Sequence, residues 1–253
     1  MNIFKVLFFA SSYRGLEAGS SSRTSFLSHT ASFKNFILFL FISFIAICAN
    51  AQTDVEFKKT LHDRSVKIVN TLEITDSVKY NRVVDILADQ YFDLNKIHDK
   101  TKESVAAIKA LQLSDGEKND RIKKEEEEKN TQLRKLHEGF ITKLQKDLSE
   151  TQIEKVKDGM TYRVMPITYT AYQDMILTLT AEQKEKIYNW LKEARELAMD
   201  EGSSDDKHKM FGKYKGRINN YLSSQGYDMK AEEKAWQQRI KEKEAAKKNN
   251  TGK

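Results

Sequence analysis

Apolar side chains recur every three or four positions along most of the chain after residue 54, the spacing typical of amphipathic helices. No comparable stretch alternates apolar and polar residues as a half-buried strand does. The chain also contains a single proline, Pro166. These patterns predict an all-α protein. We expect helices over residues 55–72, 76–111, 115–147, 150–158, 168–177, 181–200, 207–222 and 230–246.

The second and third predicted helices are long, and only residues 112–114 link them. So short a link between helices implies an antiparallel hairpin. The early turns of the third helix, RIKKEEEEKN over residues 121–130, are almost wholly charged, which is typical of a hairpin tip in solvent. A smaller C-terminal helical part is expected from Tyr162 onward, within the same single domain.

Four helix starts share a local signature, in which an apolar residue precedes Ser or Thr. The hydroxyl at this position is expected to accept a hydrogen bond from an unpaired amide of the first turn. The signature favours helix initiation and indicates no ligand. The four starts are Ile74-Thr75-Asp76, Leu113-Ser114, Leu148-Ser149 and Leu179-Thr180.

Two segments read as non-helical. Residues 159–167 contain Gly159 and Pro166 and are interpreted as an extended connector, after which Thr168 would cap a short helix. Residues 242–253 contain no apolar residue beyond two alanines and are expected to form a disordered tail.

Residues 36–48, FILFLFISFIAIC, form a thirteen-residue apolar run that follows Lys34. This is the pattern of a signal peptide, with cleavage expected near Ala51-Gln52. Ile47 is not the small residue that a lipoprotein signal needs before Cys48. We therefore expect a leader over residues 1–51, a helical domain over 52–241 and a periplasmic or secreted protein without a stable membrane anchor after cleavage.

The composition and the spacing of reactive residues argue against several classes of function. The net charge of +6 falls to +3 without the leader, which argues against nucleic acid as a partner. The single cysteine, Cys48, lies in the leader. The histidines at 62, 98, 137 and 208 show no metal-ligand spacing, and no nucleophile motif is present. We predict no metal, no cofactor and no enzyme activity.

The stretch from residue 162 to 228 concentrates basic, aromatic and glycine residues. On a helix over 207–222, Lys209, Lys213, Gly216, Arg217 and Asn220 form a stripe beside a predicted core face. That core face consists of Met210, Phe211, Tyr214, Ile218, Tyr221 and Leu222. The stripe could hold an anionic or polyhydroxylated ligand. Alternatively, it is a solvated face on which Gly212 and Gly216 allow another helix to approach.

Aromatic rings can stack on sugars, and the sequence leaves four tyrosines outside the predicted cores. The candidate ligand-binding residues are Tyr162, Tyr169, Tyr172, Lys213, Arg217, Asn220 and Tyr227. Other polar residues are interpreted as structural: His98 and His137 as partly buried side chains, and Asp200, Glu201, Asp205 and Asp206 as groups at helix ends.

The motifs EARELAMDEGSS followed by KH, and FGKYKGRINNYL, run from Glu193 to Leu222. With them, residues 57–236 resemble a family of exported Bacteroidota proteins, a domain of unknown function described as a candidate sugar-binding family. The helix starts of the form L-[ST]-x-x-Q also resemble those of small periplasmic stress chaperones.

We therefore expect an exported, non-catalytic protein that binds a carbohydrate or a related polar ligand. The alternative is a chaperone-like role in which the helical surfaces contact other exported proteins. That alternative predicts an exposed apolar groove and no compact tyrosine-lined pocket.

Overall fold

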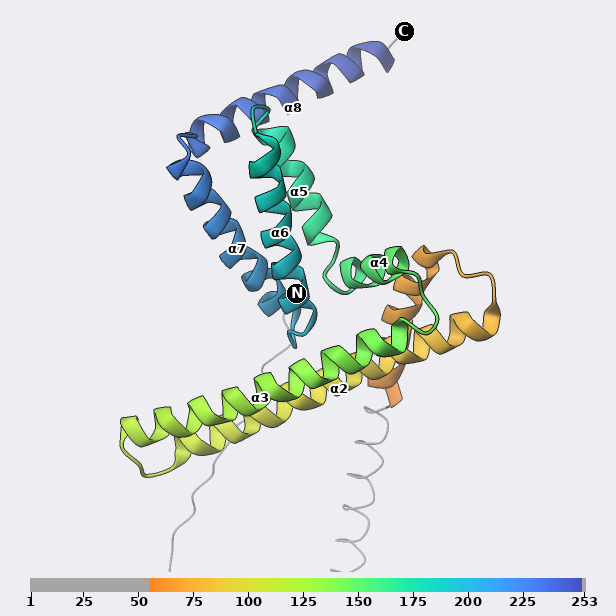
Figure 1. The fold of residues 1–253 in the computed structure, drawn as a ribbon, viewed down its shortest axis with the longest axis vertical. Coiled ribbons are helices and arrows are strands. Elements are labelled where there is room, and N and C mark those ends of the chain that lie inside the picture. The colour runs from red at the N-terminus through yellow and green to blue at the C-terminus, as the bar shows by residue number, and fades with distance from the viewer. Residues whose placement is uncertain (1–54, 252–253) are drawn as a thin grey trace, which may run out of the picture. The chain divides into compact units, whose positions relative to one another are not determined.

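The computed structural model describes residues 55–251, and the predicted leader lies outside them (Figure 1). All regular elements in this range are helices, which confirms the all-α prediction. None of these helices is both long enough and apolar enough to span a membrane. The elements are a helix over residues 55–69, η1 (Asn70–Leu72), α2 (Ser77–Ala110), α3 (Asp115–Leu144), α4 (Glu150–Met160), α5 (Val164–Met175), α6 (Ala181–Met199), α7 (Ser204–Ser224) and α8 (Met229–Thr251).

The four predicted helix starts are all capped, but the cap predicted for the first, the Thr75 hydroxyl, is wrong. Asp76 accepts there from the backbone amides of Val78 and Lys79, because a carboxylate can fill the same position. Ser114, Ser149 and Thr180 each form a capping box with the residue three positions later. Each such cap stabilises a helix by about 1 kcal/mol, so these starts are determined locally.

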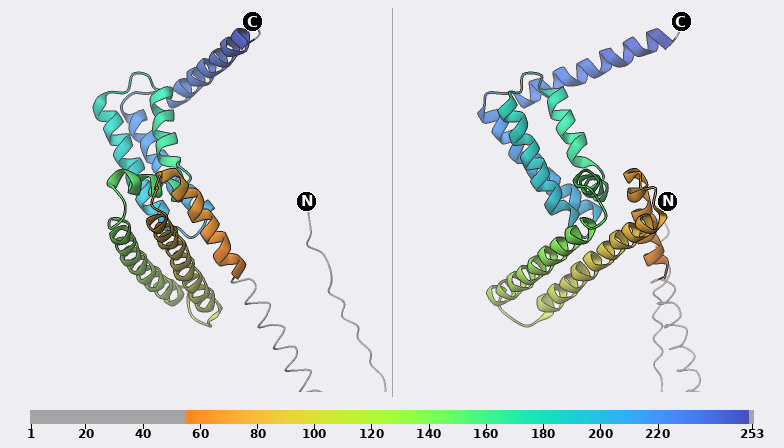
Figure 2. Two further views of the ribbon diagram at one scale, coloured as in Figure 1. Left: turned by 90° about the vertical axis from the view of Figure 1, so that its right-hand side faces the viewer. Right: turned by 45° about the vertical axis from the view of Figure 1, so that its right-hand side comes forward.

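The predicted hairpin is confirmed: α2 and α3 lie side by side and antiparallel (Figures 1 and 2). Its buried side chains are confined to the end away from the tip, where α2 contributes residues up to Leu94 and α3 contributes Phe140 and Leu144. The helix over 55–69 and α4 complete this first core. The charged tip buries no side chain.

A second core lies among α5, α6 and α7. It includes Ile187, Leu191, Phe211 and Ile218, all at most 1% exposed. The core face predicted for α7 is confirmed, because its residues are buried or partly buried here. Met199, the last residue of α6, belongs instead to the first core.

The extended connector predicted over residues 159–167 is wrong. Helix α4 continues to Met160 and α5 begins at Val164, so only three residues separate them. Tyr162 and Arg163 reverse the chain there, both with φ of 57° in the left-handed region. Pro166 lies in the first turn of α5, where its missing amide breaks no helical hydrogen bond. Thr168 is therefore inside the helix and does not cap it.

Helix α8 extends through residues 242–251, where the sequence predicts a disordered tail. Its composition of Lys, Glu, Gln and Ala favours helix even without burial. Gln238 donates to Glu242 four residues later. Arg239 attaches α8 to α5 by donating to the carbonyl oxygens of Asp174 and Met175, both at 2.8 Å.

Candidate functional site

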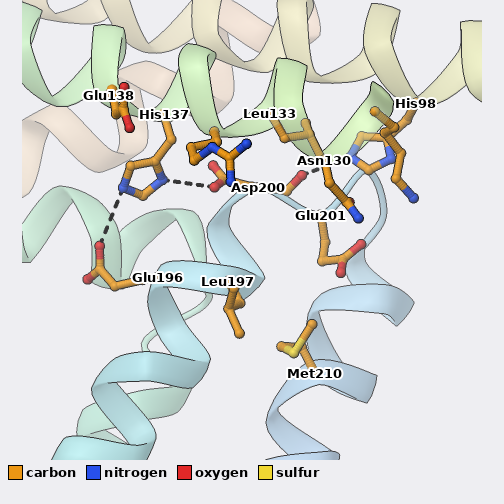
Figure 3. Close-up of a pocket in the computed structure, with 12 residues that line it drawn as sticks. His98, Asn130, Leu133, His137, Glu138, Glu196, Leu197, Asp200, Glu201 and Met210 are labelled. Atoms are coloured by element: carbon orange, nitrogen blue, oxygen red, sulfur yellow. Dashed lines mark hydrogen bonds and ion pairs between the residues drawn. The ribbon is translucent and has the colours of Figure 1, made fainter. Parts of the chain in front are cut away.

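A cavity of about 500 Å³ opens where α3 faces the end of α6 and the start of α7 (Figure 3). Three apolar side chains line it, Leu133 from α3, Leu197 from α6 and Met210 from α7, and we call them its apolar floor. The other lining side chains are polar and include both charges. They are His98, Lys129, Asn130, Arg134, His137, Glu138, Glu196, Asp200 and Glu201.

His137 connects α3 to α6. Its Nδ1 lies 2.8 Å from Asp200 Oδ2, and its Nε2 lies 3.7 Å from Glu196 Oε2 (Figure 3). The hydrogen bond to Asp200 raises the pKa of His137, and both carboxylates add to this effect against the opposing effects of burial and Lys157. The raised pKa stabilises the imidazolium, in which both ring nitrogens carry a proton.

Arg195 lies behind this histidine and is 1% exposed. It donates to Asp158 Oδ1 at 2.7 Å, to Glu196 Oε1 at 3.2 Å and to Glu154. Burial opposes the charge of Arg195, but the hydrogen bonds outweigh burial and raise its pKa. Lys157 joins the cluster through Glu196 at 2.8 Å. These residues form the charged junction: His137, Glu154, Lys157, Asp158, Arg195, Glu196 and Asp200.

The turn between α6 and α7 forms the far wall of the cavity. His98 donates from Nε2 to the carbonyl oxygen of Asp200 at 2.8 Å. Gly202 packs against this ring so closely that a Cβ there would lie 2.7 Å from His98 Cγ. Lys207 is buried and donates to the carbonyl oxygens of Ala198 and Met199, where α6 ends. Burial lowers the pKa of Lys207 to about 8.

Two buried polar atoms of the junction, Arg195 Nε and Asp200 Oδ1, have no hydrogen-bond partner among the described residues. An unpaired buried oxygen costs free energy that a donor could recover. No group of three or more His, Cys, Asp or Glu side chains within residues 55–251 is placed to hold a metal ion. The side chains that line the cavity can therefore form hydrogen bonds and charge–charge contacts with a ligand, next to the apolar floor.

Two predicted ligand tyrosines use their hydroxyls inside the protein. Tyr172 is buried and donates to Asn219 Oδ1 at 2.7 Å. Tyr227 donates to Gln183 Oε1 at 3.0 Å. The Tyr172 hydroxyl therefore joins α5 to α7, and the Tyr227 hydroxyl joins the loop between α7 and α8 to α6.

The other two tyrosines line separate cavities. Tyr162 is 45% exposed and stacks on His208, with ring centroids 5.7 Å apart. Tyr169 meets Tyr188 edge to face at 5.4 Å, in a cavity that also contains Arg195. The structure does not bring the four tyrosines together.

The predicted cation stripe lies on an exposed face of α7. Arg217 lies over the Trp190 ring at 4.6 Å and 3.6 Å from Glu193. Lys213 and Asn220 are exposed and lie in none of the four cavities described for residues 55–251. No helix of residues 55–251 approaches Gly212 or Gly216, because a Cβ at either would meet nothing within 4 Å. The exposure of the stripe agrees with the alternative of a solvated face.

The sequence analysis gave no ligand-binding role to His137 or Asp200. The two side chains are in contact although they lie 63 positions apart in the sequence. Two local signals existed. Glu196 and Asp200 lie four residues apart and so share one helix face. Arg195 follows Ala194 on the buried side of α6, and a buried arginine requires acidic partners.

The fold and the cavity define an all-helical domain with a polar site at a charged junction between two cores. The family model described as "Protein of unknown function (DUF3826)" matches residues 58–242, and the chain belongs to this family. The matched range contains both long helices, the junction and every residue of the cavity. Comparison with curated proteins gave no match.

Proposed function

We propose that the protein is an exported, non-catalytic binding protein for a carbohydrate or a related polar ligand, and that the cavity of Figure 3 holds it. One observation carries the proposal: the apolar floor lines the same cavity as many hydrogen-bond donors and acceptors. Sugars present apolar C–H faces and a periphery of hydroxyls, so they match this arrangement.

The individual groups suit hydroxyl recognition. Asn130 and Glu138 are exposed side chains of α3 that line the cavity, and Leu197 of the floor is 46% exposed. Arg134 adds up to five donors in a planar group.

The test is a thermal-shift and calorimetric screen of the purified protein against neutral trisaccharides of glucose, xylose and mannose. We expect saturable binding that Arg134→Ala weakens about tenfold, the usual effect of losing one hydrogen bond to a charged group. Lys135→Ala is the matched control, because Lys135 is the exposed neighbour on α3 that does not line the cavity. If the two variants bound the sugar with equal affinity, the cavity would not be the binding site.

The exposed face of α7 supplies a second arm of the same screen. Lys213, Arg217 and Asn220 are candidate donors outside the cavity. A Lys213→Ala, Arg217→Ala double variant that loses binding would assign the ligand to this face. No binding to any sugar by the folded protein would favour the chaperone-like role.

A further inference from the structure

A second cavity, of about 520 Å³, lies between the helix over residues 55–69 and α4. It shares no lining residue with the cavity of Figure 3. Its lining residues are Lys67, Ile68, Thr71, Lys155, Asp158, Gly159, Tyr162 and Arg163. Gly159 lets the two helices approach, since a Cβ there would lie 2.9 Å from Ile68 Cγ2.

The edge of this cavity is a strained turn. Tyr162 and Arg163 are consecutive non-glycine residues with φ of 57°. Such conformations are unfavourable for residues with a Cβ and persist only where surrounding contacts fix them. Here the Arg163 amide donates to the Asp158 carbonyl oxygen at 2.7 Å, and the Thr161 hydroxyl donates to the Lys157 carbonyl oxygen at 2.9 Å. The turn places an aromatic ring and a guanidinium at one cavity.

The charge of the cavity is unbalanced. Lys67, Lys155 and Arg163 come from three different elements and all line it. Its single carboxylate, Asp158, is already paired with Arg195 at 2.7 Å. Within residues 55–251, the side chains of Lys67 and Arg163 form no hydrogen bond or ion pair, and Lys155 reaches only the Thr71 carbonyl oxygen at 3.5 Å. Three gathered cations repel one another, and an anion would offset that repulsion.

Tyr162 adds a surface for a ring. One of its faces stacks on His208 with an interplanar angle of 13°, and the side chain is nevertheless 45% exposed. A tyrosine braced in this way offers a flat apolar face at little cost in side-chain entropy. The three cations line the same cavity as Tyr162, so a flat ring carrying a negative group fits both features.

We propose that this cavity binds an acidic sugar unit, with the sugar ring on Tyr162 and its carboxylate or sulfate on Arg163, Lys155 and Lys67. The inference extends the proposed carbohydrate binding to acidic sugars. It uses residues absent from the cavity of Figure 3, so either proposal can fail while the other stands.

The experiment is calorimetric titration of the purified protein with trigalacturonate and with its fully methyl-esterified, neutral form. We expect saturable binding of the acid, weakened by added salt, and at least about tenfold weaker binding of the ester. Similar affinity for a sulfated disaccharide would extend the site to sulfated sugars. Equal binding of acid and ester, no binding of the acid, or equally tight binding of inorganic sulfate would overturn the proposal.

Variants locate the site. A Lys67→Gln, Arg163→Gln double variant should bind trigalacturonate at least about tenfold more weakly, since two charged partners are lost. Lys59→Gln, Lys143→Gln is the control, with the same change in net charge and with one exposed lysine on the same first helix. Equal loss in both double variants would mean that net charge alone attracts the acid, which would contradict the site.

Discussion

His137 is the residue on which the candidate site depends most directly. Its ring joins α3 to two carboxylates of α6 and forms one wall of the cavity. The neighbouring charged groups are Asp200, Glu196 and Lys157, and the two carboxylates prevail, so the folded-state pKa is raised. Protonation of this histidine and stability are therefore linked.

The linkage gives a pH prediction. A raised folded-state pKa means that the contribution of His137 is complete below its unfolded value of 6.5 and is lost as pH rises through the folded value. We expect the free energy of unfolding of the wild type to exceed that of His137→Gln at pH 6, and the gap to narrow with rising pH. Urea unfolding of both proteins between pH 6 and 8 measures this difference in the free energy of unfolding. A gap independent of pH would show that the ion pairs of His137 do not stabilise the fold.

Substitution of two glycines by alanine gives a second prediction at the residue scale. The change in the free energy of unfolding should have opposite signs at the two positions. Gly216 is exposed inside α7 with open space around it, so Gly216→Ala should stabilise the protein by about 1 kcal/mol through helix propensity. Gly202→Ala should destabilise it by about 1–3 kcal/mol, because the new methyl group would overlap His98. The melting temperatures of the two variants, compared with that of the wild type, test both predictions. Stabilisation by Gly202→Ala would contradict the packing of the α6–α7 turn on α2.

At the scale of elements, the sequence predicts what is determined locally. Helix starts were predictable because Asp76, Ser114, Ser149 and Thr180 bond within their own first turns. The turn after α4 was not, because no glycine marks the left-handed backbone of Tyr162 and Arg163. Hydrogen bonds to the α4 carbonyl oxygens hold that turn.

The hairpin tip should contribute little to stability. Beyond Leu94 on α2 and before Phe140 on α3 no side chain is buried. Replacing residues 104–121 with a short glycine-rich linker should change the free energy of unfolding by less than about 1 kcal/mol. Circular dichroism during urea unfolding tests this. A loss of several kcal/mol would mean that the paired tip stabilises the core. If stability were unchanged but binding to another exported protein were lost, the result would favour the interaction role.

At the scale of the whole domain, the charged junction joins two cores whose apolar residues are otherwise largely separate. The sequence predicted the elements of each core, but not the junction. His137, Asp158 and Arg195 come from three helices, and only tertiary packing brings them together. The candidate site depends on that packing, so most of it could not be predicted from local pattern.

Arg195 tests the role of the junction. Arg195→Met leaves Glu154 and Asp158 without their buried partner and should destabilise the protein by about 3–5 kcal/mol. Arg82→Met removes an ion pair with Asp147 from a half-exposed arginine and should cost less than about 1 kcal/mol. Denaturant unfolding of the two variants gives both values. Equal effects would mean that the junction is no stronger than a surface ion pair.

The most direct measurement of ligand position is a methyl NMR titration with the neutral trisaccharide that gives the largest thermal shift. The account predicts chemical-shift changes at Leu133, Leu197 and Met210, the apolar floor of the cavity. The exposed methyl groups of Val78 and Leu177 lie outside the cavity and should not respond. Changes confined to other parts of the protein, with the floor unaffected at saturation, would contradict the proposed site.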